Sequence, residues 1–241
     1  MTDLKLAGLR VHLNRSALSQ STSMKAAVVL LHGFGAPGTD LVSIGDVISV
    51  PEGTGIFFPE GPLDLGQLLG PAYSAARAWW PIDMAQLQVA MMTGQVARAA
   101  QGIAAGLEDA SHQVRRLLDE IQSEFGLDSR RIVIGGFSQG AVACLDVALR
   151  DSRDLAGLLL MSGTMASEEA VSTLAPRRAG MRVLLSHGKS DPILPYSLAE
   201  ALRDQLNNAG WQLSWVPFPG GHGIPFDVVR AVSTLLPEWL K

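Results

Sequence analysis

The run from Gly136 to Gly140, Gly-Phe-Ser-Gln-Gly, contains a serine whose type and spacing could do nucleophilic chemistry. The apolar run Arg131–Gly135 precedes it and predicts a buried strand, while Ala141–Arg150 follows it with residues that favour a helix. In a strand-to-helix turn of the pattern Gly-x-Ser-x-Gly, a strained backbone lifts the serine hydroxyl above the sheet, and small neighbours make room for the turn. The spacing therefore predicts that Ser138 is a nucleophile at a sharp turn.

A serine hydroxyl becomes a good nucleophile only when a base takes its proton, and an acid must orient that base. Asp191 stands in a turn sequence just after a predicted strand, and His222 stands in a glycine-rich loop before the last predicted helix. Where the nucleophile follows a strand in this way, the serine comes first along the chain, the acid (Asp or Glu) second and the histidine last. The order Ser138, Asp191, His222 fits and predicts a catalytic triad.

One other histidine lies downstream of the serine and gives an alternative base. His187 directly follows a predicted strand, and Asp151 or Asp154 would have to serve as its acid. Because His187 precedes Gly188 in the sequence that leads to Asp191, we expect it to shape the Asp191 turn instead. We find no pair of histidines with metal-ligand spacing, and we predict no metal.

The tetrahedral intermediate of acyl transfer needs two backbone N–H donors for its oxyanion. One should come from Gln139, immediately after the nucleophile, and the other from the loop after an earlier strand. The sequence His32–Gly35 follows the apolar run Ala26–Leu31, so the N–H of Phe34 is the second candidate. Its side chain would then help to line a pocket for the acyl group.

The same loop allows a competing interpretation. Residues Gly33–Gly38 match Gly-x-Gly-x-x-Gly after a strand, which is the fingerprint of a dinucleotide site and of a nicotinamide- or flavin-dependent oxidoreductase. Pro37, however, removes an N–H where a helix start should offer donors to a pyrophosphate. The fingerprint also requires an acidic residue at the end of the next strand, and none stands there, since Glu60 follows Pro59 in a turn. We therefore expect no cofactor.

Alternating strand and helix patterns supply the elements that must position these loops. Strands are expected at Leu9–Leu13 (an edge strand), Ala26–Leu31, Gly55–Phe58, Arg131–Gly135, Leu155–Met161, Met181–Ser186 and Gln212–Val216, and helices at Val96–Phe125, Ala141–Arg150, Tyr196–Ala209 and Phe226–Leu240. This alternation favours an α/β fold with a mostly parallel central sheet and helices on both faces. No linker or repeat divides the chain, so we predict a single domain over residues 1–241 without a large cap domain.

The segment Leu63–Met92 does not fit the alternation. It is long, contains Trp79 and Trp80, and is rich in Leu, Met and Ala without a clean period. Loops of this length in a compact domain are usually functional. We expect either an excursion that caps the core or a short lid or wall, in which Trp79, Trp80 and the Phe34 side chain would contact substrate.

Composition limits the partners. The chain has 241 residues, 47 % of them hydrophobic, which fits one domain with a large core. Its net charge of −4 gives no electrostatic reason to expect nucleic acid, and we find neither a signal peptide nor an apolar run near the about 20 residues of a membrane span. With Cys144 as the only cysteine, no intrachain disulfide can form. We expect a cytoplasmic protein without stable membrane insertion.

Several of these motifs together resemble the phospholipase/carboxylesterase family of α/β-hydrolases, which includes the acyl-protein thioesterases. The similar pieces are Leu31–Gly35, Trp79–Asp83, Ile134–Gly140, His187–Pro192 and Gly220–Pro225. They extend along the chain from about Ala26 to the C-terminus. The resemblance implies Ser138, Asp191 and His222 as the triad, and it also implies Phe34 and Gln139 as oxyanion donors. It places Trp80 near the acyl site, and Phe34 stands where the family more usually has Leu.

The triad and the resemblance predict a serine hydrolase that cleaves carboxylic esters through an acyl-enzyme. The family includes short-chain esterases, lysophospholipases and thioesterases and so does not name the substrate, and we expect short-to-medium acyl chains. The alternative within the family is a lysophospholipase or an acyl-protein thioesterase, and a member that keeps the fold without hydrolysis is a third reading. The expected partner is a small-molecule or lipid ester. An exposed part of the terminal helix Phe226–Leu240 could also form a homodimer.

Overall fold

An eight-stranded sheet forms the centre of the computed structural model, which describes residues 1–15, 23–95, 102 and 104–241. Its strands are β1 (Thr2–Leu6), β2 (Leu9–Asn14), β3 (Ala26–Leu31), β4 (Thr54–Pro59), β7 (Ile132–Phe137), β8 (Gly157–Met161), β9 (Arg182–Gly188) and β10 (Gln212–Phe218). They lie in the order β1-β2-β4-β3-β7-β8-β9-β10. The six strands from β4 to β10 are parallel, and β2 runs antiparallel to both β1 and β4. The predicted mostly parallel sheet is confirmed.

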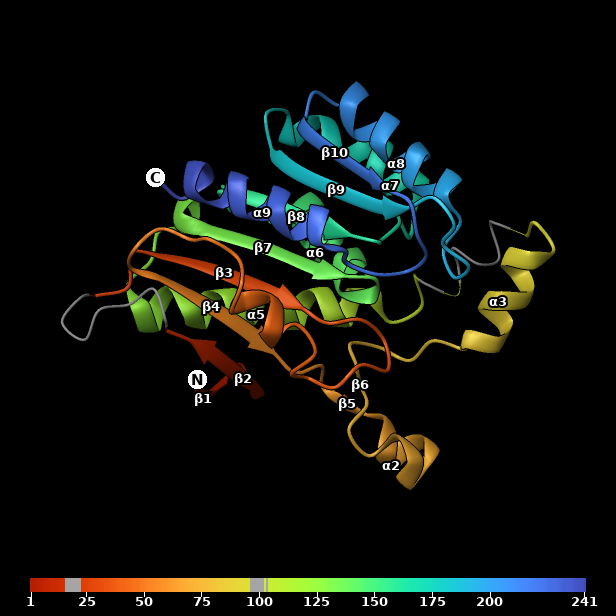
Figure 1. Ribbon diagram of the computed structural model, residues 1–241, viewed down its shortest axis with the longest axis horizontal. Coiled ribbons are helices and arrows are strands. Elements are labelled where there is room, and N and C mark those ends of the chain that lie inside the picture. The colour runs from red at the N-terminus through yellow and green to blue at the C-terminus, as the bar shows by residue number, and fades with distance from the viewer. Residues whose placement is uncertain (16–22, 96–101, 103) are drawn as a thin grey trace.

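Helices cover both faces of this sheet, as Figure 1 shows. They are α1 (Val42–Gly45), α5 (Leu107–Phe125), α6 (Gln139–Arg150), α7 (Glu168–Leu174), α8 (Tyr196–Asn208) and α9 (Phe226–Trp239), with short 3-10 helices η2 (Ser129–Arg131) and η3 (Ala175–Arg178). Apolar residues of α5, α6 and α8 form one core layer, and those of α9 form the other. Strands such as β3, whose six residues are all buried, are therefore apolar throughout, as parallel strands between two layers must be. None of the helices described here is long and apolar enough to cross a membrane.

The predicted edge strand at Leu9–Leu13 is wrong in its position. This segment is part of β2, which is paired on both sides, and β1 forms the edge of the sheet. A two-residue turn joins β1 and β2, in which Ala7 has φ 49° and Gly8 has φ 79°. Such a turn suits the twist of a hairpin, but Ala-Gly is a weaker signal for it than Asn-Gly.

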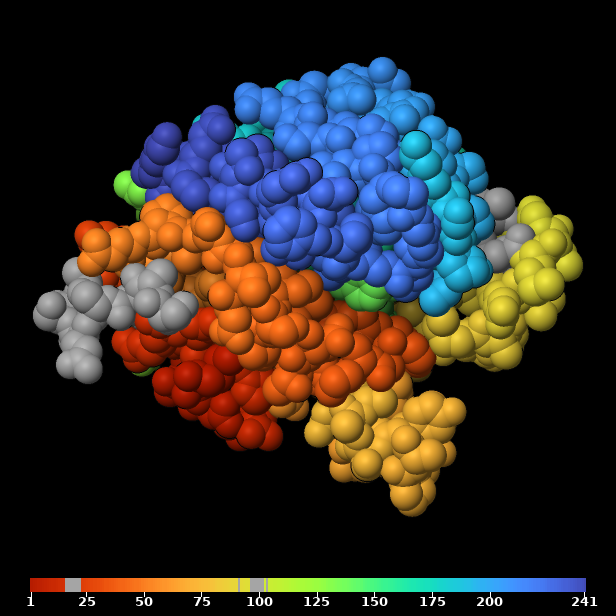
Figure 2. Space-filling model, in the orientation of Figure 1, coloured from red at the N-terminus to blue at the C-terminus, as the bar shows by residue number. Residues whose placement is uncertain are grey.

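The segment Leu63–Met92 departs from the alternating pattern as expected. It contains β5 (Leu63–Asp64), α2 (Leu65–Leu69), a 3-10 helix η1 (Pro71–Tyr73), β6 (Arg77–Ala78) and α3 (Met84–Met92). In Figures 1 and 2, α2 and α3 project from the body of the molecule. The helix expected over Val96–Phe125 is present from Leu107 onward as α5, and residues 96–101 and 103 lie outside the described residues.

Candidate active site

Ser138 lies at the sharp turn between β7 and α6. It has φ 52° and ψ −115°, a strained conformation for a residue with a side chain. Two glycines make the turn possible. A Cβ on Gly140 would lie 2.2 Å from the carbonyl oxygen of Leu31, and one on Gly136 would lie 2.5 Å from the carbonyl carbon of Gly140. The backbone at the serine is therefore held tightly against the end of β3.

His222 and Asp191 come together from two loops at the carboxyl ends of β10 and β9. Nδ1 of His222 lies 2.7 Å from Oδ2 of Asp191. The other carboxylate oxygen of Asp191 accepts the backbone N–H groups of Ile193 and Leu194, at 2.9 and 3.0 Å. These bonds fix the carboxylate, which in turn fixes the tautomer and the ring of His222.

The electrostatics of Asp191 suit a charged carboxylate. Burial by itself would raise the pKa of Asp191. The hydrogen bonds that this carboxylate accepts from His187, His222, Leu194 and Ile193 outweigh burial and hold its pKa well below the usual range. Asp191 is therefore ionised at neutral pH and can stabilise an imidazolium at His222.

One small cavity joins the predicted groups. Ser138, His222, Phe34 and Gln139 all line it, and its volume is about 120 Å³. Most of the remaining wall is apolar and consists of Trp80, Ile82, Met84, Leu87, Phe137, Val142, Ile193 and Leu194. The ring of Phe137 lies 4.7 Å from that of His222, centre to centre. The cavity thus places an apolar pocket beside a serine and an oriented imidazole.

The model of one protein family, Phospholipase/Carboxylesterase, matches residues 14–240 of the chain. The chain belongs to the phospholipase/carboxylesterase family. The resemblance predicted from the motifs is confirmed.

Similar proteins of this family include fungal and plant members. Acyl-protein thioesterase 1 of Neurospora crassa is 32 % identical over 128 residues, which cover 51 % of this chain and 52 % of the fungal protein. The chain thus spans about half the length of such fungal relatives. A probable carboxylesterase of Oryza sativa subsp. japonica is 25 % identical over 240 residues, covering 98 % of this chain and 86 % of the rice protein.

Solved structures of similar proteins support the same fold. The crystal structure of esterase PE8 is 25 % identical with a TM-score of 0.80, and the match covers 96 % of this chain and 99 % of that chain. SOBER1 of Arabidopsis thaliana, at 21 % identity and a TM-score of 0.69, shares the fold over 90 % of this chain and 99 % of its own. The α/β-hydrolase fold predicted from the sequence is confirmed.

Both predicted oxyanion residues, Phe34 and Gln139, line the cavity. Gln139 is the first residue of α6, where backbone N–H groups have no acceptor within the helix. The loop that carries Phe34 is bonded to β6, since the N–H of Gly35 donates to the carbonyl of Arg77 at 2.9 Å and the N–H of Arg77 donates to that of Ala36 at 2.9 Å. The two candidate donors therefore stand on braced backbone.

The two tryptophans differ in their positions, and the expectation that both contact substrate needs a correction. Trp80 lines the cavity, but Trp79 is not among its lining residues. The indole N–H of Trp79 donates to the carbonyl of His32 at 3.0 Å, so this side chain stabilises the loop that carries Phe34. Sequence reasoning also missed the cavity residues of α3, Met84 and Leu87, because that segment has no clean hydrophobic period.

His32 holds the same loop by a second set of bonds. The N–H of Gly61 donates to its Nε2 at 2.9 Å, so Nδ1 carries the proton and donates to the carbonyl of Gly33 at 2.8 Å. Burial lowers the pKa of His32 below its usual value. The imidazole is therefore neutral, and the loop beside the serine has a fixed anchor.

The alternative base His187 does not face the cavity. It is fully buried, its Nε2 lies 2.8 Å from the carbonyl oxygen of Leu194 and 3.2 Å from Oδ2 of Asp191, and so it shapes the Asp191 turn. Of its two suggested acids, Asp151 pairs with Arg153 instead. These contacts favour His222 as the base.

The dinucleotide interpretation of Gly33–Gly38 also finds no support. The first helix after this loop is α1, which has four residues, so the loop does not open a helix long enough to bind a pyrophosphate at its N-terminus.

Among the described residues, no three His, Cys, Asp or Glu side chains gather where they could hold a metal ion.

Proposed function

We propose that the protein is a serine carboxylesterase that hydrolyses carboxylic esters through an acyl-enzyme, with Ser138, Asp191 and His222 as its triad. The proposal rests on the position of His222. Its Nδ1 lies 2.7 Å from Oδ2 of Asp191, and the same histidine lines one cavity together with Ser138, whose backbone is strained. The membership of the chain in the phospholipase/carboxylesterase family supports it.

In the first half of the reaction, Nε2 of His222 takes the Ser138 proton while Oγ attacks the ester carbonyl carbon. The carbonyl π electrons move to its oxygen, and the N–H groups of Gln139 and Phe34 donate to the oxyanion. When the tetrahedral intermediate collapses, the bond to the leaving oxygen breaks and the imidazolium of His222 protonates the departing alcohol. Asp191 stabilises the imidazolium without accepting its proton.

In the second half, His222 takes a proton from water, whose oxygen attacks the acyl carbon. The second oxyanion collapses, the bond to Ser138 Oγ breaks, and His222 returns the proton to the serine. The products are a carboxylic acid and an alcohol, and the enzyme regains its starting state.

The size of the cavity supports short-to-medium acyl chains. The cavity volume of about 120 Å³ is well below the volume of pockets that enclose drug-sized ligands, which is roughly 300–1,000 Å³. Trp80, Met84 and Leu87 close it on the side of the Leu63–Met92 segment, which supports the role of this segment as a pocket wall. An acyl chain longer than the cavity would have to leave it or displace this wall.

The test is kcat/KM for p-nitrophenyl esters from acetate to palmitate and for an acyl-CoA thioester, with Ser138→Ala as the control. We expect a maximum at short chains and no turnover by the variant. Turnover by a clean preparation of Ser138→Ala would overturn the serine assignment.

A second candidate is a lysophospholipase or acyl-protein thioesterase, which the names of the fungal relatives favour. A rise of kcat/KM toward palmitate, or a preference for the thioester, would support it over the esterase of small substrates.

We further propose that the enzyme acts in the cytoplasm on small-molecule or lipid esters. The single, fully buried cysteine Cys144 is compatible with a reducing compartment. Cell fractionation followed by the esterase assay tests the location, and light scattering tests the homodimer, which stays a prediction.

A further inference from the structure

Two strained serines lie at the carboxyl ends of neighbouring strands. Among the described residues, those other than glycine that have a positive φ are Ala7, Ser138 and Ser162. Ala7 belongs to the turn between β1 and β2, and Ser138 is the proposed nucleophile. Ser162 directly follows β8, the strand that pairs with β7, and its φ is 49°. The mechanism proposed above makes no use of Ser162.

The turn after β8 does not by itself call for a serine. Glycine adopts a positive φ at little cost, and Gly163 stands at the next position, yet the left-handed conformation falls on Ser162. A strained residue persists only where its surroundings hold it in place, and such residues cluster at active sites. Ser162 is fully buried, so its hydroxyl needs a partner inside the protein.

The partner of this hydroxyl is the loop that carries the base. Oγ of Ser162 donates to the carbonyl of Gly223 at 3.0 Å, and Gly223 directly follows His222. The loop also contains Gly220 and Gly221, and glycines give a backbone more freedom than other residues do. An added Cβ on Gly223 would have no neighbour within 4 Å, so close packing does not hold this residue in place. The bond from Ser162 therefore fixes the loop at the residue beside the base.

Backbone bonds connect the same short segment to the other two triad residues. The N–H of Ser138 donates to the carbonyl of Met161, the residue before Ser162, at 2.9 Å. The N–H of Ser162 donates to the carbonyl of Ser186, also at 2.9 Å, and Ser186 lies in β9, which leads to Asp191. The end of β8 thus contacts the segments of the nucleophile, the acid and the base. The bond to the base loop comes from a side chain, so a substitution can remove it alone.

We propose that Ser162 is a positioning residue of the esterase reaction, whose hydroxyl holds the loop of His222 so that the imidazole stays between Asp191 and Ser138. Ser162 is not among the residues that line the cavity, so it acts through His222 and not on the substrate. The hydrogen bond, the complete burial and the strained backbone all belong to this one residue. The inference rests on the proposed function, in which His222 is the base.

Two variants separate positioning from stability. Both Ser162→Ala and Ser162→Gly lose the hydroxyl, but alanine keeps the strained φ whereas glycine relieves it. We expect kcat for p-nitrophenyl butyrate to fall roughly 10- to 100-fold in both, because a displacement of about 1 Å can cost that much in rate. KM should change less than about twofold, since the hydroxyl does not contact substrate. The glycine variant should unfold at a higher temperature than the alanine variant, whereas a purely structural role predicts that it would also keep more activity.

A spectroscopic signature reports the position of His222 without any substrate. The proton in the 2.7 Å hydrogen bond between Nδ1 of His222 and Asp191 should give a downfield resonance, which the variant His222→Gln removes and thereby assigns. We expect this resonance to broaden or move upfield in both Ser162 variants, because the imidazole is no longer held. If the unmodified chain hydrolyses none of the esters, the proposed function fails, while the resonance still tests the role of Ser162.

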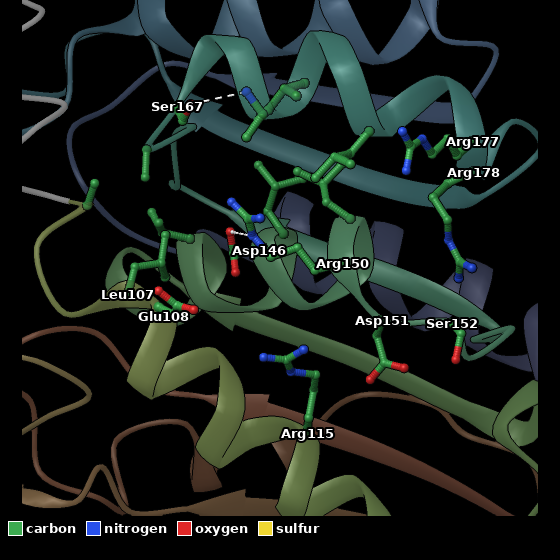
Figure 3. A pocket seen from close by; sticks show the side chains of 18 residues that line it. Leu107, Glu108, Arg115, Asp146, Arg150, Asp151, Ser152, Ser167, Arg177 and Arg178 are labelled. Carbon is green, nitrogen blue, oxygen red and sulfur yellow. Dashed lines mark hydrogen bonds and ion pairs between the residues drawn. The ribbon is translucent and has the colours of Figure 1, made fainter.

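The matched control is Ser111→Ala. Ser111 is also fully buried, and its hydroxyl donates to Asp146 at 2.7 Å. Asp146 in turn pairs with Arg150 at 2.9 Å, as Figure 3 shows, and none of these three side chains lines the cavity beside Ser138. The control should lower the temperature of unfolding but leave kcat and the His222 resonance unchanged.

Three outcomes would overturn the role of Ser162. The proposal is wrong if Ser162→Gly keeps the kcat of the unmodified chain, or if its His222 resonance is unchanged. It is also wrong if Ser111→Ala loses kcat to the same extent, because the effect would then be that of any lost buried hydrogen bond.

Discussion

The side chain of Gln139 is bonded to the backbone on both sides of the Trp79–Trp80 peptide. The N–H of Trp79 donates to Oε1 of Gln139 at 3.0 Å, and Nε2 of Gln139 donates to the carbonyl of Trp80 at 2.8 Å. Gln139 follows the nucleophile, and Trp80 is part of the cavity wall. One buried amide therefore joins the turn at Ser138 to the segment that closes the acyl pocket.

The variant Gln139→Glu tests this link. A carboxylate has the same shape and can accept from Trp79, but it cannot donate to the carbonyl of Trp80. We expect the free energy of unfolding to fall by about 1–3 kcal/mol, since a buried acceptor loses its donor, and kcat/KM to fall with it. Urea unfolding and ester kinetics measure both. Gln67→Glu, at an exposed position, is the control, and equal stability of the two variants would contradict the prediction.

The positive φ of Ser138 predicts a stability difference between two inactive variants. Alanine keeps the Cβ that strains this conformation, whereas glycine removes it. We expect Ser138→Gly to be more stable than Ser138→Ala by about 1 kcal/mol, at the lower end of the cost of such backbone strain. Thermal unfolding of the pair measures the difference, and a less stable glycine variant would argue against strain at the turn.

The variant Asp191→Asn should leave the fold intact and lower kcat/KM about 10³- to 10⁴-fold, because an amide no longer holds the correct tautomer of His222. Glutamine is not a suitable replacement, since it would also move the loop. Kinetics with p-nitrophenyl acetate measure the loss. A variant with more than a tenth of the original activity would show that Asp191 does not orient the base.

Asp191 should also affect the pH dependence of stability. Its pKa is lower in the folded chain than the about 3.9 of an unfolded aspartate, so its carboxylate stabilises the fold above about pH 5. That contribution is lost as the pH falls through about 4 toward the folded pKa. The free energy of unfolding of the unmodified chain should therefore decrease more steeply between pH 5 and 3 than that of Asp191→Asn. Parallel curves would refute the assignment.

Shortening the cavity wall should change the choice of acyl chain. Met84 on α3 lines the cavity, and Met84→Ala leaves room for additional methylene groups. Each methylene accommodated in an apolar pocket changes selectivity by about 1–3 kcal/mol, so the ratio of kcat/KM for octanoate over butyrate should rise roughly tenfold or more. Met92→Ala is the control, because Met92 lies on the same helix and is 80 % exposed. An unchanged ratio would remove α3 from the acyl pocket.

Much of the fold and of the candidate site could be predicted from local patterns in the sequence. Apolar runs such as Ala26–Leu31 identify buried strands because a parallel strand must be apolar on both faces. The glycines around Ser138 identify the turn because no larger residue fits against β3 there. The chain order of Ser138, Asp191 and His222 followed from their places just after strands, and the structure brings His222 to Asp191.

Only the tertiary structure decided which tryptophan faces the cavity, which strand forms the edge of the sheet, and which side chain holds the Trp79–Trp80 backbone. Trp79 and Trp80 are adjacent and chemically identical, so the sequence could not tell which would line the cavity and which would donate to the carbonyl of His32. Gln139 and Trp80 are 59 positions apart, and Nε2 of Gln139 donates to the carbonyl of Trp80. Their contact depends on how the start of α6 packs against the Leu63–Met92 segment, and packing between distant segments leaves no local pattern in the sequence.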